Sequence, residues 1–357
     1  MKLAELVRQS ASWLDASGAY SDVIVSSRVR LARNLRTVPF SSQNTAADEE
    51  HVVEQVLKAA QQVPQLVDGT YFDMGQLSEL ERQLLVERHL VSPALALRGG
   101  HGGVLVGPSE RFSIMVNEED HIRLQALFGG FEPQAAWALV DKIDTDLCAH
   151  LDIAFDEAFG YLTACPTNVG TGLRASILIH LPGLVLIQSI EQVLHGINHV
   201  GLTVRGFYGE GTEVIGSLFQ ISNQNSLGKP EQEILETLER VVRQIIDYEY
   251  DARQTLVHDA QAQIEDKIWR SYGILSYAHV LSGHEFMNLA SAVRLGVGLG
   301  ILKRPETKQL NELMVMVQPS HIQSLAGSNL DNDGRDVRRA ELVRSRLANG
   351  AATKRGK

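Results

Sequence analysis

Five arginines have the spacing and the neighbours that could build a phosphate-binding site. Arg28 and Arg30 are two residues apart in a predicted strand, so their side chains would share one face. Arg123, Arg174 and Arg205 each lie at the edge of a separate motif. A guanidinium stays charged and binds phosphate oxygens in pairs. Singly, each arginine is expected to be an ordinary surface residue, but five that converge would form a cage for a nucleoside triphosphate.

A glycine-containing loop carries a cysteine at one end and an arginine at the other. It runs from Cys165 to Arg174, after an apolar run at 161–164 and before an alternating apolar run from Leu173 to Leu181. The pattern predicts a loop between two strands. A thiol near a positive charge tends to ionise. A turn with a buried cysteine is the alternative interpretation.

Four motifs, taken in order, resemble the ATP:guanidino phosphotransferases, the phosphagen kinases. They are Ser26-Ser27-Arg28-Val29-Arg30, Asn117-Glu118-Glu119-Asp120-His121-Ile122-Arg123, the loop from Cys165 to Arg174, and Arg205-Gly206-Phe207-Tyr208-Gly209-Glu210. Any one of them is weak, but four in the family's order are specific. The resemblance implies an α+β fold, in which an antiparallel sheet flanked by helices, as in glutamine-synthetase-like catalytic domains, precedes an all-helical C-terminal domain.

The resemblance also implies the catalytic residues. A guanidinium has a pKa above about 12, so at neutral pH it is no nucleophile until something holds it and takes a proton. Two carboxylates can do both. By resemblance these are Glu119 and Glu210, with Cys165 as a thiolate that orients or tunes the guanidinium. The neighbouring acids that could be mistaken for them are Glu118, Asp120 and Glu213.

An ATP site follows from the same resemblance. Its expected residues are Ser26, Ser27, Arg28, Val29, Arg30, His89, Arg123, Arg174, Ala175, Ser176, Ile177, Leu178, Arg205, Gly206, Phe207, Tyr208 and Gly209. Mg²⁺ would be held mainly by the nucleotide phosphates, and no dedicated metal site is expected. His195 and His199 have zinc-binding spacing, but Gly196 stands where the corresponding motif needs glutamate.

The tail motif from Arg335 to Ala340 resembles the bacterial branch of the family that phosphorylates arginine side chains in proteins, the McsB type. A cation for a phosphate lies there beside a carboxylate for a guanidinium. The resemblance implies a phosphoarginine-binding, allosteric site outside the active site, formed by Arg335, Asp336, Arg338, Arg339 and Ala340. The expected helix is capped by Asn332 or Asp333 and buries Val337, Ala340, Val343 and Leu347. A solvated basic helix face is the alternative.

Composition excludes several classes of function. The 357 residues carry a net charge of −10, which argues against general nucleic-acid binding. Two cysteines, Cys148 and Cys165, are too few for a disulfide framework and fit a reducing cytoplasm. Residues 1–13 lack the apolar segment of a signal peptide. No apolar run approaches the roughly 18 residues of a membrane span.

Periodicity predicts the elements that must position these motifs. Helices are expected at 4–14, 45–63, 77–90, 132–151 and 189–198, strands at 23–25, 202–205 and 217–221, and a hairpin joining 102–106 to 112–116. A long helix begins at Pro230, and the pattern after it is all-helical. We therefore expect a leader at 1–20, a catalytic domain at 21–254, a helical C-terminal domain at 255–350 and a basic tail at 351–357.

Three functions fit these observations. Small-metabolite phosphagen kinases have an additional helical N-terminal domain, whereas this chain reaches Ser26 after a short leader. That difference favours a protein arginine kinase acting on exposed arginines over a kinase of free arginine or another small guanidino compound. A non-catalytic phosphoarginine-binding adaptor is the third. The resemblance further implies a zinc-binding activator protein, a Clp ATPase and protease that degrades marked proteins, and a homodimer or higher homo-oligomer.

Overall fold

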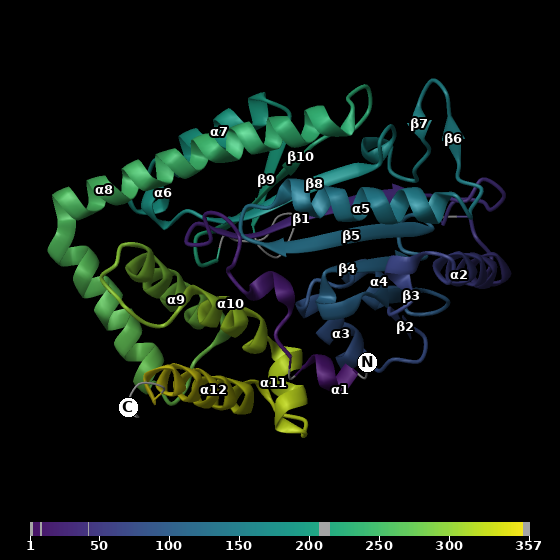
Figure 1. Cartoon of the computed structure of the whole chain (residues 1–357). Helices are drawn as coiled ribbons and strands as arrows, with labels where there is room; N and C mark the ends of the chain where they lie inside the picture. Colours follow the sequence, from purple (N-terminus) through teal and green to yellow (C-terminus); the bar gives the residue numbers. More distant parts are fainter. Residues whose placement is uncertain (1–2, 8, 42, 207–214, 353–357) are drawn as a thin grey trace.

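The computed structural model describes residues 3–7, 9–41, 43–206 and 215–352. Its centre is an eight-stranded sheet in which every neighbouring pair is antiparallel, in the order β2-β3-β4-β5-β1-β8-β10-β9 (Figure 1). These strands are β1 (Ile24–Arg33), β2 (Thr70–Asp73), β3 (Gly103–Val106), β4 (Phe112–Val116), β5 (Ile122–Gly129), β8 (Leu173–His180), β9 (Leu202–Gly206) and β10 (Leu218–Asn223). A small separate ribbon pairs β6 (Phe155–Asp156) with β7 (Gly160–Tyr161).

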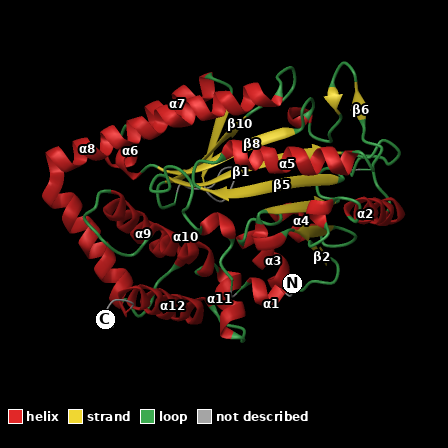
Figure 2. Cartoon of the chain, viewed as in Figure 1, coloured by secondary structure: helices red, strands yellow, loops and turns green. Residues whose placement is uncertain are grey.

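Helices flank the sheet, and the described chain after β10 consists of helices and the loops that join them (Figure 2). The α-helices are α1 (Leu3–Leu6), α2 (Ala46–Ala60), α3 (Glu79–Glu87), α4 (Pro93–Arg98), α5 (Pro133–Cys148), α6 (Pro182–Leu186), α7 (Ile190–His199), α8 (Glu231–Tyr277), α9 (Gly283–Gly298), α10 (Thr307–Met316), α11 (Pro319–Ala326) and α12 (Asn332–Ala352). Short 3₁₀ turns are η1 (Ser12–Leu14), η2 (Pro64–Leu66), η3 (Pro108–Glu110) and η4 (Pro166–Asn168). The predicted α+β class, with a helical C-terminal region, is confirmed.

The two faces of the sheet differ in chemistry because side chains alternate along each strand. On one face, Val29, Ala175 and Ile177 are fully buried in the largest apolar core, which α5 and the first part of α8 cover. A second core joins η1 to α9, α10 and α12, and a third joins α1, α3 and α4 to β2, β3 and β4. On the opposite face of the central strands, Leu127 and Leu178 belong to the second core, and polar side chains, the arginines among them, occupy the remainder.

Capping explains where two predicted helices begin. Thr45 and Asp48 form a reciprocal capping box at α2, and Ser78 and Glu81 form one at α3. The helix expected at 77–90 is shorter at its end, because His89 takes a left-handed conformation with φ of 60°. The predicted hairpin of β3 and β4 is confirmed.

Four local predictions were wrong. The helix expected at 4–14 is only α1 and η1, and the run at 161–164 contributes only Tyr161 to a strand. The cap of α12 is Asp331, whose carboxylate accepts from the Gly334 N–H at 2.8 Å, rather than Asn332 or Asp333. The tail helix buries Ala340, Val343 and Leu347 as expected, but Val337 is 42% exposed.

Helix α8 connects the sheet to the C-terminal helices. Its first part lies along the sheet, it bends, and its second part runs beside α9 and α12 (Figure 1). The bend falls at Ala260, where φ of −142° and ψ of 34° depart from helical values. The domain boundary predicted at residue 254 lies within this helix, shortly before the bend, and stays a prediction.

A buried charge cluster ties α8 to the sheet. Glu249, fully buried, accepts from the N–H groups of Gly183 and Leu184 at 2.9 and 3.0 Å and from Arg253 Nε at 2.7 Å. Arg253 also donates to Asp22, just before β1, at 3.0 Å. These bonds satisfy the first N–H groups of α6 and fix α8 against the start of the central strand.

Removing the Glu249 carboxylate should therefore destabilise the whole chain. We expect Glu249→Ala to lower the free energy of unfolding by about 3–5 kcal/mol, because Arg253 is left buried with one partner fewer. Denaturant titration measures this. Glu236→Ala is the matched control, since Glu236 is exposed on the same helix. Equal stability of the two variants would contradict the prediction.

Candidate active site

Strand register brings the predicted arginines onto one face of the sheet. Arg30 in β1 lies opposite Arg174 in β8, and Arg28 lies two residues along the same face. Arg123 in β5 is opposite Ala32, which continues that face, and Arg205 in β9 is opposite Gln220, whose side chain accepts from Arg28 Nη2 at 3.0 Å. Antiparallel partners point the same way. The five arginines therefore share a single surface, which we call the basic face.

Guanidiniums are crowded on the basic face around Arg28 and Arg30. Burial, followed by the charges of Arg123 and Arg174, lowers the pKa of Arg28 to about 10. Burial and the three neighbouring guanidiniums also lower the pKa of Arg30. Arg30 Nε is buried and makes no hydrogen bond within the described part of the chain. Like charges held at this density are costly unless an anion joins them, so the face fits a polyanion.

A small pocket opens beside Arg28 at the end of the basic face. Ser26, Ser176, Leu178 and His89 line it, together with Leu127 and Gln220. Burial, then the charge of Arg28, lowers the pKa of His89 to about 3, so its imidazole is neutral at physiological pH. The Trp13 ring contacts the His89 ring edge-on, with centroids 5.4 Å apart. Apolar side chains and a neutral imidazole therefore border the basic face at this end.

The turn between β4 and β5 separates three consecutive acids into three environments. Glu118 is buried, pairs with Arg123 at 2.6 Å and accepts from Ser92 Oγ at 2.6 Å. Burial alone would raise the pKa of Glu118, but Arg123 and these hydrogen bonds lower it. Asp120 is also buried, whereas Glu119 is exposed at the tip. Partial desolvation, followed by the charges of Asp120 and Glu118, raises the pKa of Glu119.

Asp120 joins this turn to the cysteine loop. Its Oδ1 accepts from Asn34 Nδ2 and from the backbone N–H of Ala164, each at 2.7 Å. Ala164 precedes Cys165 and Glu119 precedes Asp120, so one hydrogen bond links the two segments that carry these predicted catalytic residues. The bond to Ala164 also explains why no regular strand leads into Cys165. The Cys165 Sγ lies 3.1 Å from Thr167 Oγ1.

Some predicted ATP-binding residues have side chains on the apolar face of the sheet, opposite the basic face. Val29, Ala175 and Ile177 are core residues of the apolar face, and the Ser27 hydroxyl donates to Gly130 O at 2.8 Å on that side. Their side chains therefore support the strands rather than line the basic face. Gly206 ends β9. The predicted residues Phe207, Tyr208, Gly209 and Glu210 lie outside the described residues.

The tail motif divides into an accessible and a buried part. Arg335 lines a pocket with residues of α11 and of the start of α3, including Ser320, Gln323 and Ser78. Arg338 is exposed and pairs with Glu341 at 2.8 Å. The other three residues of the motif, Asp336, Arg339 and Ala340, make contacts within the C-terminal helices.

Arg339 acts as a structural link between the C-terminal helices. It is buried and donates to Val317 O at 2.8 Å and Leu281 O at 2.9 Å, besides its ion pair with Asp336. Ala340 is buried beside it. Of the five residues predicted to bind phosphoarginine, the structure thus places Arg335 at a pocket and Arg339 and Ala340 in the core.

Sequence reasoning missed three residues that shape the site. Asn34 and Gln220 hold Asp120 and Arg28, and Arg98 donates to the backbone of the Glu119 turn. Asn34 follows the Ser26–Arg30 motif within the same strand region, which was a usable signal. Gln220 and Arg98 are far from their partners in sequence, so only tertiary contacts reveal them.

Within the described residues, no group of three or more His, Cys, Asp or Glu side chains is arranged to hold a metal ion, and the His195 and His199 rings stack on each other at 4.8 Å. None of the described helices has the length and apolar character needed to cross a bilayer.

Comparisons with known proteins agree with this geometry. The family model of the ATP:guanido phosphotransferase C-terminal catalytic domain matches residues 51–252, and that of the protein-arginine kinase McsB C-terminal domain matches residues 261–357. A protein-arginine kinase of Halothermothrix orenii is 45% identical over 97% of this chain and 99% of its own. One of Brevibacillus brevis is 47% identical over 94% of this chain and 95% of its own. The crystal structure of lombricine kinase matches with a TM-score of 0.57 and 25% identity, over 68% of this chain and 71% of that chain.

The two cysteines should react differently with iodoacetamide. Burial, then the charge of Asp144, raises the pKa of Cys148 to about 12, so its thiol stays protonated. Cys165 lies in the loop that Asp120 holds next to Glu119. We expect Cys165 to be labelled faster than Cys148 and to be protected when both substrates are bound. Peptide mass spectrometry measures the labelling of each cysteine. Equal labelling without protection would assign Cys165 to the fold alone.

Proposed function

The chain belongs to the ATP:guanido phosphotransferase family, and from that premise we propose that it transfers the γ-phosphoryl group of ATP to arginine side chains of proteins. The observation that carries the proposal is the meeting of the basic face with the turn of Glu119 and the loop of Cys165. Near-full-length similarity to protein-arginine kinases and the matching C-terminal domain support arginine in proteins as the acceptor.

The nucleotide would bind along the basic face. Arg28, Arg30, Arg123, Arg174 and Arg205 would hold the phosphates and stabilise the charge that develops on the transferred group. The pocket at His89 would take the nucleoside. Mg²⁺ would be held mainly by phosphate oxygens and water, and it supplies charge neutralisation when bound.

The acceptor arginine would enter beside Glu119. The Glu119 carboxylate would hold the planar guanidinium, and Glu210 would be the second carboxylate that holds it. As the bond between the guanidinium nitrogen and the γ-phosphorus forms and the bond from that phosphorus to the ADP oxygen breaks, Glu119 would accept the one proton that the nitrogen loses. Cys165 orients or tunes the guanidinium rather than forming a phosphocysteine. Glu118 is a poor candidate for this task, because Arg123 and Ser92 already occupy its carboxylate.

The tail would bind the product of the reaction, a phosphoarginine. We assign Arg335, in its pocket between α3, α11 and α12, as the cation that binds the phosphate of a phosphoarginine outside the active site. By family, a zinc-binding activator protein and a Clp ATPase and protease are the proposed partners. A cytoplasmic location and a homodimer or higher oligomer belong to the same proposal.

Two alternatives make different demands on the assay. A kinase of free arginine would consume ATP without a protein acceptor. A phosphoarginine-binding adaptor would consume none with any acceptor. Incubation of enzyme and Mg-ATP with a protein acceptor, with free arginine or with neither distinguishes the three functions. Intact mass spectrometry before and after acid treatment identifies phosphoarginine, since phosphoramidates are acid-labile.

The first expected result concerns Glu119. Glu119→Gln keeps the side chain's shape but loses the charge that binds the guanidinium, so we expect phosphorylation to fall on the order of a hundredfold or more. ATP affinity should change less than about twofold. Glu54→Gln, an exposed glutamate on α2, is the control for the loss of one surface charge.

The pH dependence gives an independent readout of the same residue. The carboxylate form is the active one, and the pKa of Glu119 is raised. Activity should therefore fall, as pH is lowered, at a higher pH than an ordinary glutamate would give. Near-normal turnover of Glu119→Gln would remove this residue from the mechanism.

A second expected result concerns the tail. Arg335→Ala should abolish binding of free phosphoarginine at the tail, measured by calorimetry, and leave basal activity on a good protein substrate. Arg240→Ala is the control for the loss of one surface charge, because Arg240 is exposed on α8. If the site is coupled to catalysis, phosphoarginine should shift activity by about 1–3 kcal/mol in wild type only. Equal binding by both variants and wild type would return this motif to a solvated helix face.

A further inference from the structure

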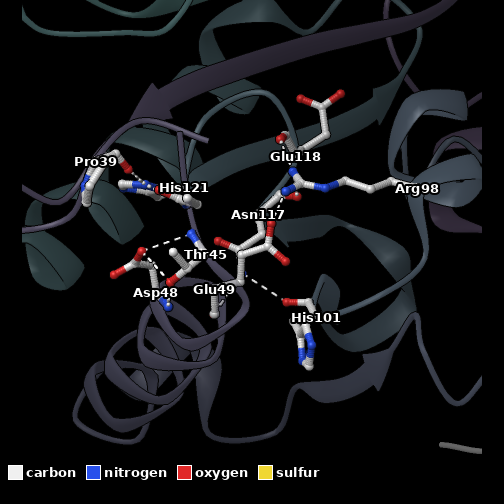
Figure 3. A network of polar contacts seen from close by, with 10 residues as sticks. Pro39, Thr45, Asp48, Glu49, Arg98, His101, Asn117, Glu118 and His121 are labelled. Atoms are coloured by element: carbon white, nitrogen blue, oxygen red, sulfur yellow. Dashed lines mark hydrogen bonds and ion pairs between the residues drawn. The ribbon is translucent and has the colours of Figure 1, made fainter. Parts of the chain in front are cut away.

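An arginine outside the four motifs holds the backbone of the turn that carries Glu119. Arg98, the last residue of α4, donates from Nη1 to Asn117 O at 3.0 Å and to Glu118 O at 3.1 Å (Figure 3). Its Nη2 forms an ion pair with the Glu49 carboxylate. One planar guanidinium therefore connects two consecutive carbonyls of the turn to a carboxylate on α2.

Glu49 holds the same turn a second time. Its backbone carbonyl accepts from Asn117 Nδ2 at 2.8 Å, and that amide also donates to His101 O at 2.9 Å. Asn117 has φ of 58°, a left-handed conformation that asparagine tolerates better than most residues. The turn thus begins at a residue fixed by its own side chain, and Arg98 fixes the next peptide.

These contacts leave little freedom to the residue that follows. The Glu119 N–H donates to Glu118 Oε2 at 2.8 Å, and that oxygen is bound by Arg123 at 2.6 Å. The peptides before Glu119 are held by Arg98, and Asp120 after it is held by Asn34. Only the Glu119 side chain is exposed among the three acids. Its direction is therefore set by the backbone on both sides.

Arg98 is at the pocket of Glu119 but is committed elsewhere. Ala94, Leu95, Arg98, Glu118 and Glu119 line one pocket, so the guanidinium borders the place where an acceptor would enter. Its donors nevertheless point at two carbonyls and a carboxylate, and the side chain is 35% exposed. That geometry suits holding a loop more than capturing an anion.

We propose that Arg98, with Glu49, is a positioning residue for the reaction: it fixes the peptides before Glu119 so that the carboxylate meets the acceptor guanidinium in the productive orientation. The inference rests on the proposed role of Glu119. Arg98 touches neither substrate in this assignment, and it acts through the turn. Misplacement of a reacting group by about 1 Å can cost on the order of a hundredfold in rate.

The test is a pair of variants made alone and together. In the full chain, Arg98→Ala should lower kcat about tenfold or more, while KM for ATP changes less than about twofold. Combined with Glu119→Gln, Arg98→Ala should lower the rate little further, because the group it positions is already disabled. Transfer of labelled phosphate from ATP to a protein acceptor, followed at several ATP concentrations, measures kcat and KM for each variant. Arg270→Ala is the matched control, since Arg270 forms an exposed ion pair with Asp266 at 3.3 Å on α8.

The outcomes separate this inference from the proposed function. Wild-type turnover in Glu119→Gln would overturn the role of Glu119 and this inference with it. A slow Glu119→Gln, together with unchanged kcat in a folded Arg98→Ala, would overturn this inference alone. So would a full multiplicative loss in the double variant, which is the behaviour of a merely structural residue.

A second variant keeps the test decisive if Arg98→Ala does not fold. Arg98→Lys retains a charge for Glu49, but a single ammonium cannot reproduce the planar fork that reaches two carbonyls and the carboxylate. We expect folded Arg98→Lys, checked by its melting temperature, to lose at least about threefold in kcat. Wild-type kcat in this variant would contradict the proposal.

Discussion

The crowding of guanidiniums on one face of β1, β5 and β8 is the constraint around which the rest of the site is built. Antiparallel register sets Arg30 directly opposite Arg174, an arrangement that opposes pairing. The other face of the same strands compensates, because Val29, Ala175 and Ile177 are fully buried beneath α5 and α8. The sheet therefore holds its charges in place before any ligand arrives, and a polyanion gains from repulsion that it relieves.

The three acids of the turn between β4 and β5 also differ in their surroundings. Glu118, Glu119 and Asp120 are adjacent and chemically alike. The Glu118 carboxylate is bound by Arg123 and Ser92, and the Asp120 carboxylate is bound by Asn34 and Ala164. What separates Glu119 is the tight turn, which leaves its side chain at the tip while its neighbours point inward. Neighbouring negative charge and partial desolvation then raise its pKa, which makes it a better proton acceptor than an ordinary surface glutamate.

Much of this was predictable from the sequence where the information is local. Period-2 spacing placed Arg28 and Arg30 on one face, and Thr45 with Asp48 marked the start of α2. The strand expected before Cys165 failed because a hydrogen bond from Ala164 to Asp120, 44 residues away, holds that segment off the sheet. The predicted burial of Val337 was wrong for a similar reason. Periodicity identifies the apolar face of a helix, but it does not show how far along that face other helices pack against it. Arg98 had no signal, because two of its partners are backbone carbonyls and the third, the Glu49 carboxylate, is 49 residues away in the sequence.

The position of α3 relates the two pockets physically. Its start, at Ser78, lines the pocket of Arg335, and the chain reaches His89, in the pocket beside Arg28, two residues after its end. Near that end, Glu87 accepts from the first N–H groups of α11, at Ser320 and His321, at 2.7 and 3.0 Å. Displacement of α11 must therefore either break those hydrogen bonds or carry α3 with it. A ligand at Arg335 that merely fills the pocket leaves His89 unaffected, whereas one that moves α11 acts on the segment that holds His89.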